Sequence, residues 1–366
     1  MRRRSLLLTA TAAGLTACGG GYALSRRPED ATPRDHQEDG VPEQLRGALP
    51  PAHAAVIALD QASVADASPG GIQHALRELL HALDAARLSG AKAGPALGAA
   101  LFARHGRNER RPRGLTEMPA FPGDLLDPAR SHGDVLVQIA ADRRTVVGSA
   151  VDQLLKATPA WNLRWRADGF RPDNHDANGQ GLTRNPFHFT EGFGNPNSGR
   201  ATYDRALVQV SDDEPDWAIG GSYQVVRVIR LATELWDKDP VHEQERIIGR
   251  RRGGRWLDGT PPSEEPNFRS DPRGLITPLD SHVRLAAPDR RNPPQMVRRS
   301  YSYDGGDGDA GLLFSCFQRN VVQGFEAVQK RLADESMAKY LLTVGGGYFF
   351  VPPPTSPWMG AAFDDA

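Results

Sequence analysis

Side chains that could carry chemistry gather in two stretches of this sequence. The first is residues 188–196, HFTEGFGNP, in which Glu191 lies among aromatic and glycine residues. The second begins at His282, continues to Arg298 and ends at Asp309. A carboxylate can move a proton, an arginine can hold an anion, and a histidine can bind a metal through one ring nitrogen. Taken singly, however, a histidine is more often a surface or hydrogen-bonded residue than a metal ligand.

The common local motifs of enzymes are absent. There is no dinucleotide-binding glycine fingerprint and no phosphate-binding loop, and His242-Glu243 lacks the second histidine of a zinc-protease helix. Cys18 and Cys316 are the two cysteines, which excludes a cysteine zinc cluster. Cys316 lies in the apolar run 311–317, so we interpret it as a packed core thiol. Asp304 and Asp307 do not have EF-hand spacing and are interpreted as turn residues.

Several segments, taken in order, resemble one protein family. Three carry most of the likeness: residues 188–196; residues 279–288 (LDSHVRLAAP) with 298–303 (RRSYSY); and residues 309–314 (DAGLLF) with 345–350 (GGGYFF). Shorter matches support them: FPGD at 121–124, HGD at 132–134, GGSY at 220–223, WD at 236–237 and EQERIIGR at 243–250. Together they resemble the dye-decolorising (DyP-type) haem peroxidases, and within them the exported bacterial deferrochelatase branch of ferrous-iron uptake. The resemblance covers about Ala54 to Pro354.

The resemblance implies a role for each of four residues. His282 would bind haem iron from one face, with one haem b per chain, and Asp309 would orient its second ring nitrogen. On the opposite face, Glu191 would move the proton of H₂O₂, and Arg298 would stabilise negative charge on the peroxide oxygens. Residues that would contact haem or crowd its pocket are Gly192, Phe193, Gly194, Ala287, Pro288, Asp289, Leu312 and Phe314, together with Arg298.

The sequence departs from the family pattern at several of these positions. Glu191 replaces an aspartate, and His188 replaces a glycine that precedes it. Ala287 and Asp289 stand where the family has asparagine and arginine. A glutamate places its carboxylate one methylene farther out, and a displacement near 1 Å can cost about 100-fold in rate. Three possibilities therefore remain open: a peroxidase, including iron release from haem; a membrane-tethered haem carrier or sensor with weak or no turnover; and a scaffold with no cofactor.

The elements that must position these residues follow from hydrophobic periodicity. In the first part of the chain, the pattern predicts four strands, at residues 54–59, 97–102, 135–140 and 161–165. Apolar residues recur at helical spacing over 72–83 and 146–154. This β-α-β-β-α-β order is the ferredoxin-like pattern.

A second cycle of the same kind follows the irregular stretch 167–202. We expect strands at 223–231, 282–286, 311–317 and 348–351 and helices at 240–249 and 322–332, with a polar excursion at 250–274. The predicted fold class is therefore α+β: two ferredoxin-like halves with antiparallel sheets, and haem in the C-terminal half. We place the N-terminal domain at residues 49–200 and the haem domain at 201–366.

The first residues of the chain have the pattern of an export signal. Arg3-Arg4-Ser5 precedes an apolar stretch that ends near Leu15, which is too short to span a bilayer and fits a twin-arginine signal over residues 1–17. Cys18 follows small residues, as in a lipoprotein, although an ordinary signal peptide with an incidental cysteine remains an alternative. Residues 18–48, rich in glycine, proline and charge, are predicted to be a flexible tether. We expect a cell-envelope protein, lipid-anchored at the outer face of the membrane or free in the periplasm or outside.

The balance of charge limits the class of partner. The chain has 44 basic and 45 acidic residues, a net charge of −1, and no long basic block after the leader, so we expect no nucleic-acid partner. The expected partners are H₂O₂, small electron donors or dyes, and components of an iron-uptake system. A homodimer is left open.

Overall fold

The computed structural model describes residues 40–46, 49–62, 69–171, 184–192, 195, 208–211, 213–288, 296–354 and 357–364. All of them belong to one compact unit that begins at Gln37. The domain boundary that we predicted at residue 200 and the predicted signal and lipidation residues, Cys18 included, lie outside the described residues.

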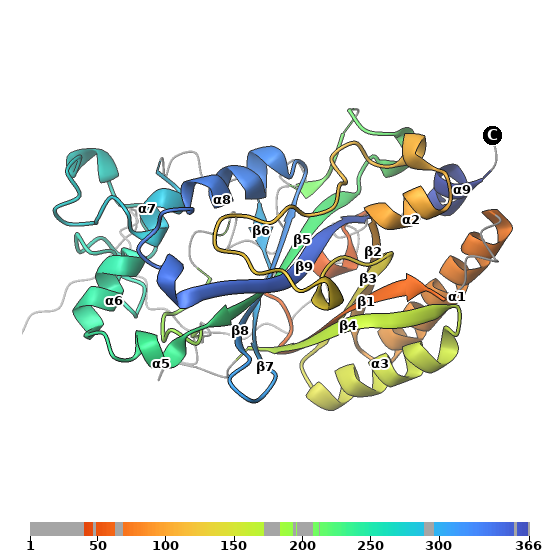
Figure 1. Cartoon of the computed structure of the whole chain (residues 1–366), viewed down its shortest axis with the longest axis horizontal. Coiled ribbons are helices and arrows are strands. Elements are labelled where there is room, and N and C mark those ends of the chain that lie inside the picture. The colour runs from red at the N-terminus through yellow and green to blue at the C-terminus, as the bar shows by residue number, and fades with distance from the viewer. Residues whose placement is uncertain are drawn as a thin grey trace, which may run out of the picture. The chain divides into compact units, whose positions relative to one another are not determined.

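The N-terminal half has the predicted β-α-β-β-α-β order. Its main elements are β1 (His53–Gln61), α1 (Pro69–Leu88), β2 (Lys92–Gly98), α2 (Ala99–Arg104), β3 (Val135–Ala141), α3 (Arg144–Ala157) and β4 (Trp161–Phe170). The strands are antiparallel in the order β2-β3-β1-β4, with α1 and α3 packed together beside them (Figure 1). The apolar residues spaced over 72–83 lie on the buried side of α1. Strand β3 is apolar along almost its whole length because both of its faces are covered.

The C-terminal half repeats this order with shorter helices. Its elements are β5 (Ser222–Leu231), α5 (Thr233–Trp236), α6 (Val241–Ile248), α7 (His282–Ala286), β6 (Val297–Arg298), β7 (Tyr301–Asp304), β8 (Ala310–Gln318), a π-helical turn (Val322–Glu326), α8 (Ala327–Arg331), β9 (Leu341–Val351) and α9 (Trp358–Phe363). Strands run in the order β9-β5-β8-β7, and β6 pairs with the far end of β8. The predicted α+β class with two ferredoxin-like antiparallel halves is confirmed.

The two sheets join at both edges. β2 pairs with β9 at Leu97 and Gly98, and β4 pairs with β7 at Gly169 and Phe170, so the strands close into a ring in which β8 returns to β5. Alternate residues of each strand therefore face inward or outward. In β1, Ala54, Val56 and Ala58 belong to the inner cluster. The outward residues Ala55, Ile57 and Leu59 pack with α1 and α3.

Three expectations about local structure are wrong. Residues 282–286 form helix α7 rather than the strand that we expected. The prediction failed because five residues are too few to distinguish a helical period from that of a strand. The strand expected at 97–102 ends at Gly98 and continues as α2, so the strand itself lies earlier, at 92–98. The predicted tether also ends too late. A 3₁₀ turn at Glu43–Leu45 buries Gln44 and Leu45 against the body, where Leu45 accepts a hydrogen bond from Arg299 Nη2 (2.8 Å).

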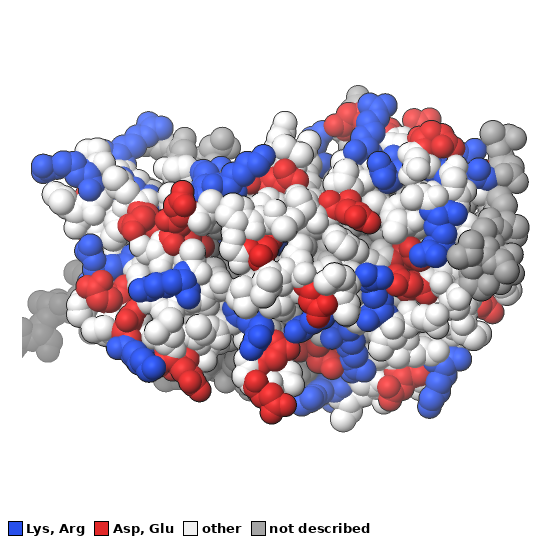
Figure 2. Space-filling model, in the orientation of Figure 1, with Lys and Arg blue, Asp and Glu red and all other residues white. Residues whose placement is uncertain are grey.

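The charge of the surface and the character of the helices complete the description of the folded unit. Figure 2 shows basic and acidic side chains interspersed over the visible face, in line with the balanced composition. Among the described residues, no helix combines the length and apolar character needed to cross a bilayer.

Candidate active site

A pocket of about 400 Å³ opens on the outward side of the C-terminal sheet. Its floor is made by outward residues of three neighbouring strands: Arg227 and Ile229 of β5, Leu312 and Phe314 of β8, and Leu341 and Thr343 of β9. Helices α7 and α8 and the preceding π-helical turn supply further lining residues, which include His282, Val283, Phe325 and Val328. Residues 122–124 of the N-terminal half complete one wall.

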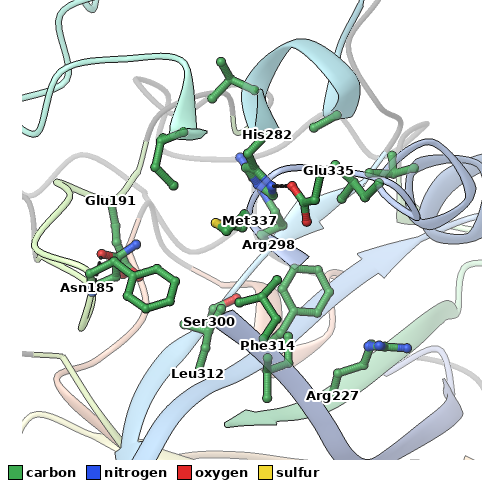
Figure 3. A pocket seen from close by; sticks show the side chains of 18 of the residues that line it. Asn185, Glu191, Arg227, His282, Arg298, Ser300, Leu312, Phe314, Glu335 and Met337 are labelled. Carbon is green, nitrogen blue, oxygen red and sulfur yellow. Dashed lines mark hydrogen bonds and ion pairs between the residues drawn. The ribbon is translucent and has the colours of Figure 1, made fainter. Parts of the chain in front are cut away.

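His282 is the first residue of α7 and lines this pocket. Its Nδ1 lies 2.6 Å from Oε2 of Glu335, whose side chain is only 4% exposed (Figure 3). An ionised carboxylate only accepts hydrogen bonds, so Nδ1 carries the proton and donates it. In the neutral ring this leaves Nε2 with a lone pair, the form in which imidazole binds a metal.

The segment that carries Glu335 also fixes both ends of α7. Arg331 of α8 donates from Nε to Leu285 O (2.9 Å) and from Nη2 to Ala286 O (2.8 Å), at the carboxyl end of the helix. Before its amino end, Asp280 O accepts from the backbone N–H of Ser336 (3.2 Å). Hydrogen bonds at both ends of α7 therefore hold the segment of His282 against the segment of Glu335.

Glu191 and Arg298 lie at the same pocket, with Glu191 on a different wall from His282 (Figure 3). Glu191 follows a tight turn in which Asn185 Oδ1 accepts from the backbone N–H groups of Phe187 (3.1 Å) and Phe189 (3.0 Å). His188 occupies the left-handed position of that turn, with φ of 70°, and its Nε2 lies 2.9 Å from Asp237 Oδ1. The turn thus sets the direction in which the chain delivers Glu191.

Arg298 is held through its backbone by the same segment of chain. Asn195 Nδ2 donates to Arg298 O (3.0 Å), and Asn195 Oδ1 accepts from Arg298 N–H (2.9 Å). Arg298 also sits in β6, opposite Cys316 of β8. Asn195, four residues after Glu191, therefore fixes the backbone of Arg298.

The electrostatics of this wall act on the Glu191 carboxyl group. Burial raises the pKa of Glu191, and the positive charges of Arg171, Arg298 and Arg250 oppose that shift without cancelling it. Burial lowers the pKa of Arg250 to about 10, helped by Arg298 and opposed by Glu191. Glu191 is thus an acid–base group whose proton is released at higher pH than that of an ordinary glutamate.

Two family descriptions match consecutive parts of the chain. Residues 49–171 match "Dyp-type peroxidase, N-terminal", and residues 183–356 match "Dyp-type peroxidase, C-terminal". This chain belongs to the Dyp-type peroxidase family. The resemblance read from the sequence is confirmed.

Individual proteins are similar to this chain over much of its length. A deferrochelatase of Escherichia coli O6:K15:H31 is 41% identical over 71% of this chain, and one of Yersinia pestis is 41% identical over 70%. The chain spans 65% and 62% of those two proteins. Among solved structures, an oxyferrous complex of DtpA from Streptomyces lividans has a TM-score of 0.77 at 29% identity, covering 87% of this chain and 95% of that one. A DyP-type peroxidase from Cellulomonas bogoriensis has a TM-score of 0.74 at 31% identity, covering 83% and 90%.

Asp309 does not have the role that we expected for it in this Dyp-type peroxidase. It lies at the β7–β8 hairpin, where it accepts from Tyr303 Oη (2.9 Å) and from Arg130 Nη1 (2.9 Å), and it is not among the residues that line the pocket. The acid beside His282 is Glu335. Asp309 instead ties the C-terminal hairpin to Arg130 of the N-terminal half.

The other expected site residues divide into three groups. Gly192, Ala287, Leu312 and Phe314 line the pocket with His282, Glu191 and Arg298. Pro288 is exposed and does not line it, and Phe193, Gly194 and Asp289 lie outside the described residues. His188, 46% exposed, belongs to the turn rather than to the pocket lining. Cys316 is fully buried, which raises its pKa to about 12, as befits a core thiol.

Sequence reasoning missed a buried ion pair at the pocket wall. Arg227 donates from Nη1 to Asp124 Oδ2 (3.0 Å), and both side chains are 3% exposed. The guanidinium lies 5.3 Å from the ring centroid of Phe121 and 5.6 Å from that of Phe325. The motif at 121–124 drew attention to Asp124, but nothing in the sequence indicated that Arg227 is its partner.

Proposed function

We propose that this chain is a haem-dependent peroxidase that uses H₂O₂ to oxidise small electron donors or dyes. The single observation that carries the proposal is that one pocket holds both a histidine anchored by a buried carboxylate and, on another wall, an acid with arginines. Membership of the Dyp-type peroxidase family supports it.

The residues present fit one haem b. His282 would bind the iron through Nε2, since Nδ1 is engaged by Glu335, and Leu312, Phe314 and Val283 offer apolar contacts for a macrocycle. Haem iron can be held by a single protein ligand, and His282 would supply it. Among the described residues there is no group of three or more His, Cys, Asp or Glu that could hold a bare metal ion. When bound, the haem supplies the redox chemistry that passes two electrons from donors to peroxide.

The protein's own groups handle the protons and the charge. Glu191, ionised, would take a proton from one oxygen of the peroxide and return it to the other, departing oxygen. Arg298 holds that departing oxygen and stabilises the negative charge that develops on it. Each peroxide gains two electrons and two protons and leaves as two waters. Glu335 keeps the His282 ring in the orientation and tautomer that iron binding needs.

Iron release from haem is the more specific activity that we propose for the same pocket. The support is the 41% identity to proteins named deferrochelatase. A ferrous-iron uptake system is the partner that this activity would serve, and a homodimer is compatible with it.

We also propose export by the twin-arginine route and attachment to the envelope by lipid on Cys18. The support is the pattern of residues 1–18. In this arrangement the predicted tether would join Cys18 to the folded unit, which begins at Gln37.

The test is a spectrum and two assays on the purified full chain. We expect a Soret band with haem bound one to one, dye oxidation that depends on peroxide, and transfer of iron from haem to a ferrous chelator. Failure to bind haem would refute the proposal. Haem binding without dye oxidation would favour a carrier, and intact haem in the iron-release assay would refute the more specific activity alone.

A further inference from the structure

Thr190, the residue before Glu191, is held by hydrogen bonds with residues 250–252, the start of the polar stretch 250–274. Arg252 O accepts from both the backbone N–H and the hydroxyl of Thr190, each at 3.0 Å. Arg250 Nη2 donates to Thr190 O at 2.7 Å. All the polar groups of Thr190 are thereby used, and the backbone that delivers Glu191 is fixed by residues 250–252.

Residues 250–252 are themselves held by helix α6. Glu245 accepts from Arg252 N–H (3.2 Å) and from Arg251 Nη1 (2.8 Å), and Gln244 accepts from Arg252 Nη2. The Gln244 side chain in turn donates to Trp236 O (2.7 Å), which fixes its amide. A continuous set of hydrogen bonds therefore runs from α6 to the turn before Glu191, and residues 244–252 supply it.

Gly249 joins this set to the histidine side of the pocket. It ends α6 with φ of 92°, a left-handed conformation that favours glycine. A Cβ there would lie 2.5 Å from Val283 Cγ2 and 2.8 Å from Ser281 Oγ, so α6 can approach α7 closely only with glycine at this position. Arg250, the next residue in the chain, lines the pocket close to α7, the helix that carries His282.

The Arg250 guanidinium is buried where a charge is costly to bury. It is 9% exposed, and its Cζ lies 5.5 Å from the ring centroid of Phe189. The charged groups that act on Glu191 are Arg171 at the end of β4, Arg298 of β6 and Arg250. The other charged pairs at this pocket, His282 with Glu335 and Arg227 with Asp124, compensate each other. The positive charge of Arg250 therefore favours the ionised form of Glu191.

We propose that Arg250 is a positioning residue for Glu191, which fixes the backbone at Thr190 and keeps the neighbouring carboxylate ionised. This inference rests on the proposed peroxidase function, because there Glu191 must be ionised to accept the proton of peroxide. It adds a residue of the pocket wall that acts through the acid.

Three substitutions separate the hydrogen bond from the charge. Arg250→Gln keeps a donor for Thr190 O and loses the charge, Arg250→Lys keeps the charge and loses the planar fork, and Arg250→Met loses both. Arg246→Met is the matched control, because it removes one arginine charge from the exposed side of α6. Two properties are measured on each full-length variant: the pH profile of peroxide-dependent dye oxidation, and the titration of Glu191 by pH-difference infrared spectroscopy, with Glu191→Gln to identify its band.

Loss of the positive charge raises the pKa of Glu191, so the acid limb of the profile and the infrared titration move together to higher pH. We expect about one pH unit in Arg250→Gln and Arg250→Met, and little shift in Arg250→Lys or Arg246→Met. The plateau rate should fall about 10-fold to 100-fold in Arg250→Met, and less in Arg250→Gln. Should Arg250→Met not fold, the Gln and Lys pair decides.

The result that overturns the inference is an infrared titration of Glu191 that is the same in Arg250→Gln as in the wild type. The infrared measurement is also made on protein without haem. A chain that fails to bind haem would refute the proposed function, whereas the titration would still test the link between Arg250 and Glu191.

Discussion

The two halves share one topology and use it differently. In the N-terminal half the outward face of the sheet is covered by α1 and α3, helices of 20 and 14 residues whose apolar sides fill the space against Ile57, Leu59 and Val137. In the C-terminal half the corresponding face carries α7, of five residues, and α8, of five residues after a π-helical turn of five. The strands beneath them present Arg227, Leu312 and Thr343. A site arises where long packing helices are replaced by short ones held by side-chain hydrogen bonds.

Loss of His282 should have the largest effect, because it removes the one iron ligand that we assign to the C-terminal half. We expect His282→Ala to lose haem or to show a different ligation state by absorbance. His242→Ala, on the exposed side of α6, is the matched control and should keep the wild-type spectrum and haem content. A wild-type ferric spectrum in His282→Ala would place the ligand elsewhere and break the functional contrast between the halves.

Substitutions of Arg298 and Glu191 should differ in degree. Arg298→Leu removes a fixed positive charge where negative charge develops, and we expect a loss of about 100-fold to 1000-fold in the rate of peroxide consumption. Glu191→Gln removes a base whose carboxylate extends one methylene beyond the family's aspartate, so its cost should stay below about 100-fold. Stopped-flow mixing with peroxide measures both. A larger loss in Glu191→Gln would show that the glutamate is a fully competent base.

The raised pKa of Glu191 also predicts the shape of the pH profile. A base acts when ionised, so activity should be lost as pH falls through the raised pKa, at a higher pH than an ordinary glutamate would give. In Glu191→Gln this acid limb should disappear while the remaining activity persists at low pH. Steady-state rates over a range of pH test it, and an unchanged limb in Glu191→Gln would assign it to another group.

The sequence predicted the regular parts of the fold because long periodic segments leave little choice. The spacing of Ile72, Leu76 and Leu83 specifies a helix, and the run in β3 specifies a buried strand. It failed where only tertiary contacts decide. The five residues of α7 are too few to show a helical period. Which acid, Asp309 or Glu335, lies beside His282 depends on how α8 and the residues after it pack against α7.

A paired substitution of these two acids tests that correction. Glu335→Gln keeps the size of the side chain but removes the charge beside Nδ1 of His282, and we expect haem affinity or peroxidase activity to fall about 10-fold to 100-fold. Asp309→Asn should leave the spectrum and the activity close to wild type and weaken only the contacts at the hairpin with Arg130 and Tyr303. A changed ferric spectrum in Asp309→Asn with a normal one in Glu335→Gln would restore the original assignment.

The smallest expected effect tests the packing contrast itself, in protein without haem. Ile57 of β1 and Ile229 of β5 both face outward from the first strand of their half, but Ile57 is fully buried under α1 and α3, whereas Ile229 lines the pocket. Ile57→Ala leaves a cavity in a closed core and should lower the free energy of unfolding by about 2–5 kcal/mol. Ile229→Ala only enlarges a space that already exists, so it should lose little beyond the transfer of the removed atoms, about 1 kcal/mol. Urea denaturation of both variants measures the difference. Equal losses would mean that the outward face of the C-terminal sheet is packed as tightly as that of the N-terminal sheet, and the open pocket would then need haem to form.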